Sequence, residues 1–167
     1  MCKVYLKDLI EFDKESFLDY CNRCECLDLE ICSDAIFNID NDVITLDLTW
    51  VREKECIVPK FVYRIVNEHR YSNLFIRYLD LNNVKIIDDY GLYKFTIYEL
   101  VANNLVKINS FGMKECSYLK ELYLPNLESI ESFGFSDCKL LEKIKAPNLK
   151  EIDSLAFFNC INLMSYK

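Results

Sequence analysis

Four cysteines near the N-terminus have the residue type and the closeness of a metal site. Cys21, Cys24, Cys26 and Cys32 include one C-x-x-C pair, a spacing with which many zinc sites begin. The complete spacing departs from the standard zinc arrangements, and Cys21 and Cys24 would share one apolar face of a helix. Free cysteine packs as a small hydrophobic residue. We therefore expect core packing here, with a zinc-binding protein as the alternative, and we expect no cofactor and no resident metal.

The remaining candidates for chemistry are weak. His69 is the single histidine of the chain, which argues against a histidine-based triad and excludes a multi-histidine metal site. We expect His69 to end the core-facing stripe of a helix. Asp40-Asn41-Asp42 resembles the start of a calcium loop, but the required glycine and the distal glutamate are absent. A polar turn between strand-like stretches at 36–39 and 43–48 fits it better. The sequence therefore predicts a protein that is not an enzyme.

The elements that would position any site are set by an internal repeat. Cys116, Cys138 and Cys160 are 22 residues apart, and other residue types recur with the same or nearly the same period. A fixed period of about 20–29 residues with regularly spaced leucines predicts a solenoid. The further recurring sets are Leu105, Leu127 and Leu149; Ile108, Ile130 and Ile152; Asn104, Asn126 and Asn148; Pro125 and Pro147; and Gly91, Gly112, Gly134 and Ala156.

Each repeat has the pattern of one coil with an apolar interior. Leu122 and Leu124 alternate with Tyr123, as expected of a short strand with one face inward. The pattern predicts that Phe133, Phe135, Cys138 and Leu141 also point inward. One coil cannot enclose these side chains alone, so neighbouring coils must stack on it.

These residues resemble the BspA-type leucine-rich repeats, which share an F-x-x-C-x-x-L segment, a strand, a Pro-Asn turn and an isoleucine. The segment occurs here at 135–141 and again at 157–163, and the resemblance covers residues 75–167. It implies an α/β repeat fold: a right-handed leucine-rich-repeat solenoid with a short parallel sheet on its concave side. The asparagine lies one position earlier than in common leucine-rich repeats, so we do not expect a buried asparagine ladder.

The first 74 residues are expected to form an N-terminal cap with degenerate repeat strands, ahead of leucine-rich repeats at 75–167. Asp13 has the properties of a helix N-cap, and Phe12 and Phe17 those of a hydrophobic staple, for a helix at 14–24. A second helix is predicted at 59–70. Leu27-Asp28-Leu29 and Thr45-Leu46-Asp47-Leu48 repeat the pattern of Leu79-Asp80-Leu81, which predicts strands of one sheet.

Two surfaces are candidates for binding. The first is the concave strip, formed by residues that alternate with the inward leucines. The strip changes from acidic to aromatic to basic along the chain, and Tyr123 at its middle is the expected anchor. Its members are Asp28, Asp47, Tyr78, Asp80, Val101, Glu121, Tyr123, Lys143 and Lys145. The second is an uncapped C-terminal edge at Leu163, Met164 and Tyr166, where another protein or a second copy would stack.

The net charge of −7 disfavours nucleic acid and anionic membrane surfaces as partners. The start of the chain does not read as a signal peptide, and nine cysteines favour a reducing compartment, so we expect a cytoplasmic protein. The sequence therefore favours a non-enzymatic protein-protein interaction module, a scaffold or assembly component. The resemblance adds one alternative, a cell-surface adhesin of BspA type.

Overall fold

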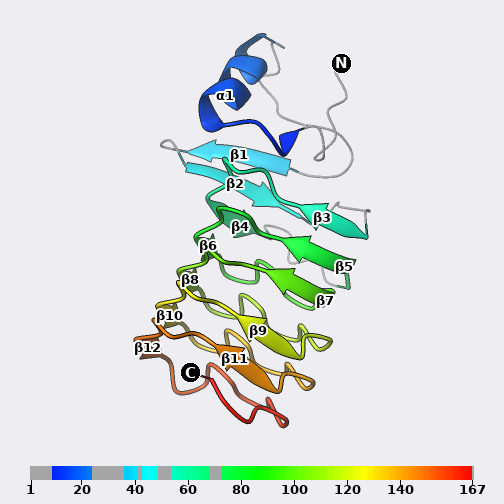
Figure 1. Cartoon of the computed structure of the whole chain (residues 1–167), viewed down its shortest axis with the longest axis vertical. Coiled ribbons are helices and arrows are strands. Elements are labelled where there is room, and N and C mark those ends of the chain that lie inside the picture. Colours follow the sequence, from blue (N-terminus) through cyan, green and yellow to red (C-terminus); the bar gives the residue numbers. More distant parts are fainter. Residues whose placement is uncertain (1–8, 24–35, 41–42, 49–53, 68–72, 167) are drawn as a thin grey trace.

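The computed structural model describes residues 9–23, 36–40, 43–48, 54–67 and 73–166. Over 54–67 and 73–166 the chain winds in coils that stack along one axis (Figure 1). Each coil contributes a strand to each of two columns and closes through turns on a third side. The elements are α1 (Lys14–Arg23), β1 (Ile36–Asp40), β2 (Val43–Asp47), β3 (Glu55–Ile57), β4 (Arg64–Val66), β5 (Phe75–Asp80), β6 (Ile86–Ile87), β7 (Thr96–Val101), β8 (Lys107–Ile108), β9 (Glu121–Tyr123), β10 (Ser129–Ile130), β11 (Lys143–Lys145) and β12 (Glu151–Ile152).

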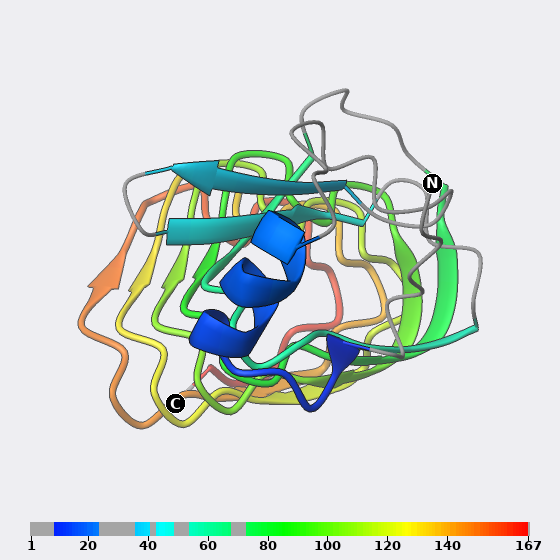
Figure 2. The same cartoon turned by 90° about the horizontal axis from the view of Figure 1, so that it is seen from above.

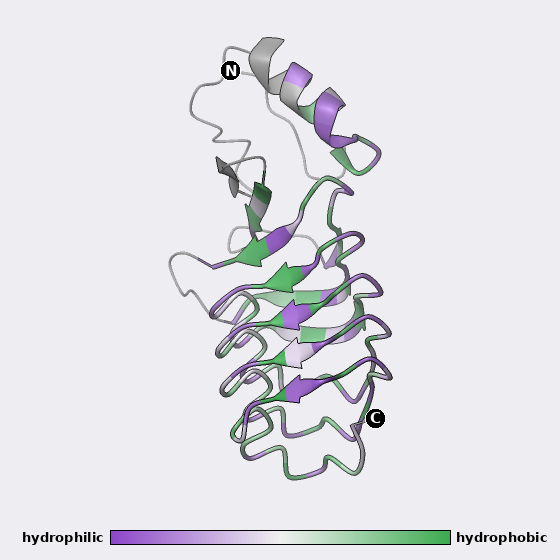
Figure 3. Ribbon diagram, turned by 90° about the vertical axis from the view of Figure 1, so that its left-hand side faces the viewer, coloured by the Kyte–Doolittle hydropathy of each residue, from purple (hydrophilic) through white to green (hydrophobic). Residues whose placement is uncertain are grey.

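The first column is a seven-stranded sheet in the order β1-β2-β4-β6-β8-β10-β12. Every neighbouring pair is parallel except β1 with β2. One isoleucine of each coil stands in register with the next, which confirms the predicted repeat position. Figure 3 shows hydrophilic and hydrophobic residues following each other along these strands. The isoleucines are Ile65, Ile87, Ile108, Ile130 and Ile152, of which the first four are buried.

The second column contains β3, β5, β7, β9 and β11, stacked in chain order (Figure 1). All paired neighbours are parallel, as the resemblance implies. The column is hydrogen-bonded as two groups, β3-β5-β7 and β9-β11, with no ladder between β7 and β9 in the described residues. Alternate residues point inward, so Leu79, Leu122 and Ile144 are buried while their strand neighbours face outward.

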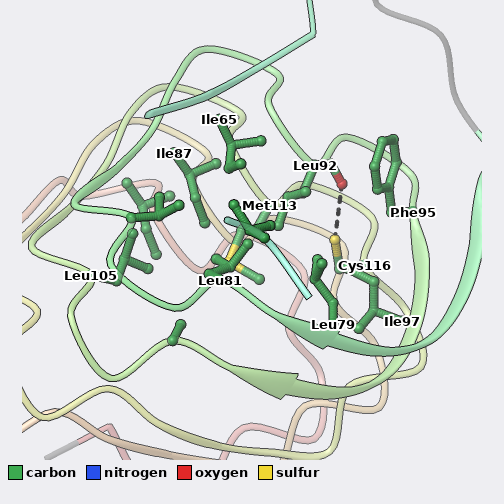
Figure 4. Packing of buried hydrophobic residues seen from close by; sticks show 14 of the residues in the cluster. Ile65, Leu79, Leu81, Ile87, Leu92, Phe95, Ile97, Leu105, Met113 and Cys116 are labelled. Carbon is green, nitrogen blue, oxygen red and sulfur yellow. Dashed lines mark hydrogen bonds between the residues drawn. The ribbon is translucent and has the colours of Figure 1, made fainter. Parts of the chain in front are cut away.

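The core is one continuous column of apolar side chains inside the coils. Figure 4 shows Leu79, Leu81, Phe95 and Ile97 from one side meeting Ile87 and Leu105 from the other. Burial of one such side chain stabilises the fold by about 1.5–3 kcal/mol. Phe135, Cys138 and Leu141 are fully buried as predicted.

The prediction that Phe133 points inward is wrong, because Phe133 lies on the outer turns and is only half buried. Its backbone has a φ of 58°, and Tyr90 and Phe111 have φ values of 60° and 61° at the equivalent places. Such a left-handed conformation turns the side chain away from the interior and is unusual for an aromatic residue. The rings stack in succession, with centroids 4.9 Å apart for Tyr90 and Phe111 and 5.1 Å apart for Phe111 and Phe133. Contacts between coils therefore hold the aromatic residues on the outside.

The repeated asparagines lie on the surface and join successive coils. The side-chain amides of Asn104, Asn126 and Asn148 each donate to a backbone carbonyl of the preceding coil, at distances of 3.0, 2.8 and 2.8 Å. None of the three is buried. The ladder is thus external, consistent with the one-residue shift seen in the sequence.

The predicted N-terminal helix is confirmed over Lys14–Arg23. Asp13 caps it, since its side-chain Oδ1 accepts the backbone N–H of Ser16 at 2.7 Å. Phe17 is fully buried and its ring stacks on Phe61 with centroids 4.1 Å apart. Figure 2 shows α1 and the β1–β2 hairpin lying across the N-terminal end of the stack.

The second helix predicted at 59–70 is wrong for its described part. Residues 59–61 form a turn in which Val62 N–H donates to Pro59 O, and the chain then continues as β4. Val62 and Ile65 are both buried, as on a helix face, but they enter the core from a turn and a strand. Pairing of β4 with β2 and β6 outweighs the local helical periodicity.

The strands predicted at 36–39 and 43–48 are confirmed as an antiparallel pair, with Asp40 paired to Val43. Asn41 and Asp42, where the polar turn was predicted, lie outside the described residues. The prediction that the strand at 43–48 and Leu79-Asp80-Leu81 belong to one sheet is wrong. Leu46 pairs with Ile65 in the seven-stranded sheet, whereas Leu79 and Asp80 pair with β3 in the second column. Leu27-Asp28-Leu29 lies outside the described residues. The L-D-L pattern alone could not distinguish two columns that both bury alternate residues.

Candidate interaction surface

The outward side of the second column, here called the long-strand face, gathers the residues that the sequence singled out. Tyr78, Asp80, Val101, Glu121, Tyr123, Lys143 and Lys145 all lie on it, as predicted, on β5, β7, β9 and β11. Asp47 does not. It lies on β2 in the other column and is only 2% exposed, so it belongs to the packed interior and not to the strip.

The register orders these residues in two rows across the strands. The first row runs Glu55, Tyr78, Glu99 and then, after the break, Glu121 and Lys143. The second row runs Ile57, Asp80, Val101 and then Tyr123 and Lys145. Neighbouring members of a row stand about one strand spacing apart, roughly 4.8 Å. Along these two rows the charge is therefore acidic toward β3 and basic at β11, while the exposed Arg77 of β5 lies outside the rows.

Aromatic side chains form an exposed patch beside these rows. Phe75 and Tyr98 meet edge to face with ring centroids 5.9 Å apart, and Tyr98 contacts Tyr118 at 5.0 Å. Tyr123, the predicted anchor, is 57% exposed. Clustered exposed aromatic residues are typical of protein interfaces. Periodicity could not find Phe75, Tyr98 and Tyr118, because the repeat does not conserve an aromatic residue at those places.

The charges on the long-strand face differ from those elsewhere on the solenoid. Away from it, ion pairs join adjacent coils: Arg64–Asp88, Lys94–Glu115, Lys107–Glu131, Lys114–Asp137 and Lys150–Glu128. In the part of the chain that the structure describes, the charged residues of the two rows form no ion pair. Asp80 accepts the backbone N–H of Asn82 at 2.8 Å, which fixes the following turn. The face thus keeps its charges available.

Tyr78 shows the electrostatic character of the acidic half. Partial burial raises the pKa of its phenol, and the carboxylates of Asp80, Glu99 and Glu55 raise it further. The phenol therefore remains protonated and keeps an O–H donor on the face. The half of the face around β3, β5 and β7 favours cationic or hydrogen-bond-accepting groups.

The cysteine ladder supports structure and no chemistry. Cys116, Cys138 and Cys160 are free thiols, and each Sγ–H donates to a backbone carbonyl of the preceding coil. The acceptors are Leu92 O at 3.1 Å, Met113 O at 3.2 Å and Phe135 O at 2.9 Å; Figure 4 shows the first. Burial raises the pKa of Cys116 to about 12 and that of Cys138 well above its ordinary value. A thiol kept protonated is a poor nucleophile.

Most of the predicted metal candidates lie outside the described residues. Cys24, Cys26, Cys32 and His69 lie outside the described residues, and Cys21 belongs to α1. Within the described residues, no group of three or more His, Cys, Asp or Glu side chains is placed to hold a metal ion. No helix in that same part of the chain is long and apolar enough to cross a membrane.

The last coil exposes apolar side chains whose equivalents are covered in earlier coils. Ile152 is 38% exposed, whereas Ile130 at the same repeat position is 2% exposed. At the predicted C-terminal edge, Met164 and Tyr166 are exposed and Leu163 is half buried. The backbone ladder also stops here: Phe135 N–H donates to Ala156 O at 2.8 Å, while the equivalent N–H of Phe157 has no such acceptor in the described residues.

These features define a parallel β-solenoid with an exposed charged and aromatic face and with free thiols that donate hydrogen bonds between its coils. Comparison with known families identifies it further. Residues 54–166 match the family described as BspA type leucine-rich repeat region, in 6 copies. The chain therefore belongs to the BspA-type leucine-rich-repeat family. No curated protein and no solved structure matches the chain.

Proposed function

We propose that the protein is a non-enzymatic protein-protein interaction module, a scaffold or assembly component, that binds its partner on the long-strand face. The family membership supports an interaction role. The observation that carries the choice of face is its set of charges without ion pairs beside an exposed aromatic patch. Aromatic residues supply contact area in interfaces, and charges at the rim orient the partner.

Affinity capture from the native cell tests this function. The double variant Tyr123→Ala with Lys145→Glu removes the anchor and reverses the basic end, and it is expected to lose the captured partner. Both side chains are exposed, so the free energy of unfolding should change by less than about 0.5 kcal/mol. The variant Met164→Ser with Tyr166→Ser tests the exposed C-terminal edge separately. Recovery of the partner by the first variant at the wild-type level would exclude the long-strand face.

The two ends of the solenoid have separate proposed roles. We propose that α1 caps the N-terminal end, supported by the burial of Leu9 and Phe17 against the first coil. The C-terminal edge at Leu163, Met164 and Tyr166 is proposed as a second contact surface for another protein or a second copy. Its exposed apolar groups support this role. If the variant Met164→Ser with Tyr166→Ser also fails to capture the partner, the C-terminal edge takes part in binding.

A cytoplasmic location remains part of the proposal, supported by thiols that act as hydrogen-bond donors and so serve the fold in reduced form. The alternative is a cell-surface adhesin of BspA type. Immunolocalisation in intact and permeabilised cells separates the two. Zinc analysis of the purified chain tests the remaining alternative, a zinc-binding protein, since one tightly held equivalent would assign Cys21, Cys24, Cys26 and Cys32 to a metal.

A further inference from the structure

Within the described residues, the charges of the two rows form no ion pair, and most of the acid lies at the opposite end of the long-strand face from the base. Glu121 is the exception, since it stands in register beside Lys143 without pairing with it. Glu55 and Asp80 lie on β3 and β5, whereas Lys143 and Lys145 lie on β11. Three strand spacings separate β5 from β11, or about 14 Å, well beyond the reach of an ion pair. On the other sides of the solenoid, the opposite charges stand on adjacent coils and do pair. The face therefore carries an acid end at β3 and β5 and a base end at β11, which lie too far apart to form an ion pair within one chain.

We infer that the long-strand face also binds itself: a second copy packs face to face on it with the solenoid axis reversed. This inference rests on the proposed function, since it names an occupant of the same face. A two-fold axis lying in the interface and parallel to the strands reverses the order of the strands but keeps each row opposite itself. An acid end then meets a base end twice, as an isologous interface requires.

A pairing centred on β7 overlaps all strands of the column and fixes the contacts. It sets β11 opposite β3 of the copy, so that Lys143 faces Glu55 in the first row. It sets β9 opposite β5, so that Tyr123 faces Asp80 in the second row. In the second row, Val101 of β7 lies opposite its own copy at the axis. Glu99 meets its copy as the one like-charged pair, which limits the affinity.

The apolar content of the face agrees with a weak, reversible dimer. Ile57, Tyr98, Tyr118 and Tyr123 are 38–57% exposed, and a facing copy would cover them. Interfaces of small area with charged contacts bind in the micromolar range or weaker. A partner that binds the same face must then displace the second copy, so the partner and the second copy compete for one surface.

Analytical ultracentrifugation of the full chain tests the inference. The wild-type chain is expected to dimerise reversibly, and its dissociation constant should rise at least about tenfold between about 0.05 M and 0.5 M salt. Two charge-reversed variants should each be monomeric: Lys143→Glu with Lys145→Glu, and Glu55→Lys with Glu99→Lys. Mixed in equal amounts, they should form a heterodimer, because both acid–base contacts are restored and the central Glu99 pair becomes opposite in charge. Heterodimer formation also shows that both variants are folded.

The variant Ile161→Lys with Met164→Lys charges the C-terminal edge, the other surface proposed for a second copy, and so separates the two surfaces: a dimer formed through the long-strand face should survive it. A wild-type chain that stays monomeric up to about 1 mM overturns the inference, given the affinity expected of small interfaces. A dimer that is lost in the C-terminal edge variant but kept in the charge-reversed variants also overturns it. The same holds if the equal mixture of the two charge-reversed variants remains monomeric. A monomeric chain that still captures its partner through the face overturns the inference and leaves the proposed function standing. If instead the chain forms a charge-dependent dimer but the variants of the long-strand face capture the partner normally, the inference stands and the proposed function of this face is overturned.

Discussion

Substitution of Gly134 by alanine tests how tightly adjacent parts of one coil pack. A methyl group added at this position would lie 2.6 Å from Cγ2 of Ile130 and 3.2 Å from the carbonyl oxygen of Glu131. The φ of Gly134 is not positive, so the need for glycine comes from space and not from backbone conformation. Ile130 is 2% exposed and branched at Cβ, so its methyl cannot rotate aside freely.

The expected loss is a balance of two effects. Overpacking a core position costs about 1–3 kcal/mol. Restricting the unfolded chain by replacing glycine with alanine offsets about 0.4–1 kcal/mol of that. We expect Gly134→Ala to lower the free energy of unfolding by about 1–2 kcal/mol, which urea titration followed by far-UV circular dichroism will measure.

Two companion variants make the reasoning specific. Ile130→Leu removes the branch at Cβ, so the double variant with Gly134→Ala should be more stable than the sum of the single losses predicts, by at least about 0.5 kcal/mol. Ala156→Gly, at the same repeat position in the last coil, should cost only about 0.5–1 kcal/mol, because no overpacking is involved. An unchanged urea midpoint for Gly134→Ala would refute the packing argument.

Two further predictions concern titration and capping. Because the pKa of Cys116 is raised from 9.0 to about 12, its stabilising effect is present below pH 9 and is lost as the pH rises toward 12. The urea midpoint of the wild type should therefore fall more steeply above pH 9 than that of Cys116→Ala; parallel curves would contradict this. Asp13→Ala should speed amide hydrogen exchange in α1, and Asp13→Ser should restore the protection, because serine can also cap the helix. In the wild type, this protection should weaken as the pH falls through the lowered pKa of Asp13.

The repeat predicted the fold because its period fixes what stacks on what. Ile108, Ile130 and Ile152 align in one sheet, and Leu122 and Ile144 align in the other, as equal spacing requires in parallel coils. The misplaced helix at 59–70 shows the limit of this approach. An apolar residue at every third or fourth position describes a helix face, but it also describes a turn followed by a strand when neighbouring strands complete the pairing.

The candidate surface was predicted in part for a related reason. Alternation placed Tyr78, Asp80 and Tyr123 on the outside of their strands, and the structure agrees. Alternation also placed Asp47 there, because the pattern carries no information on which column a strand joins. The aromatic contact of Tyr98 with Tyr118 arises from stacking between coils of unequal sequence, so no single repeat shows it.

The break between β7 and β9 has a mechanical consequence. On the opposite side of the same two coils, β8 and β10 remain hydrogen-bonded in register. A stack that is bonded on one side and open on the other bends most easily at that step, with the bonded side as its hinge. Glu99 and Glu121 flank the opening. The face is therefore expected to bend more easily at this step than at the hydrogen-bonded steps β5–β7 and β9–β11.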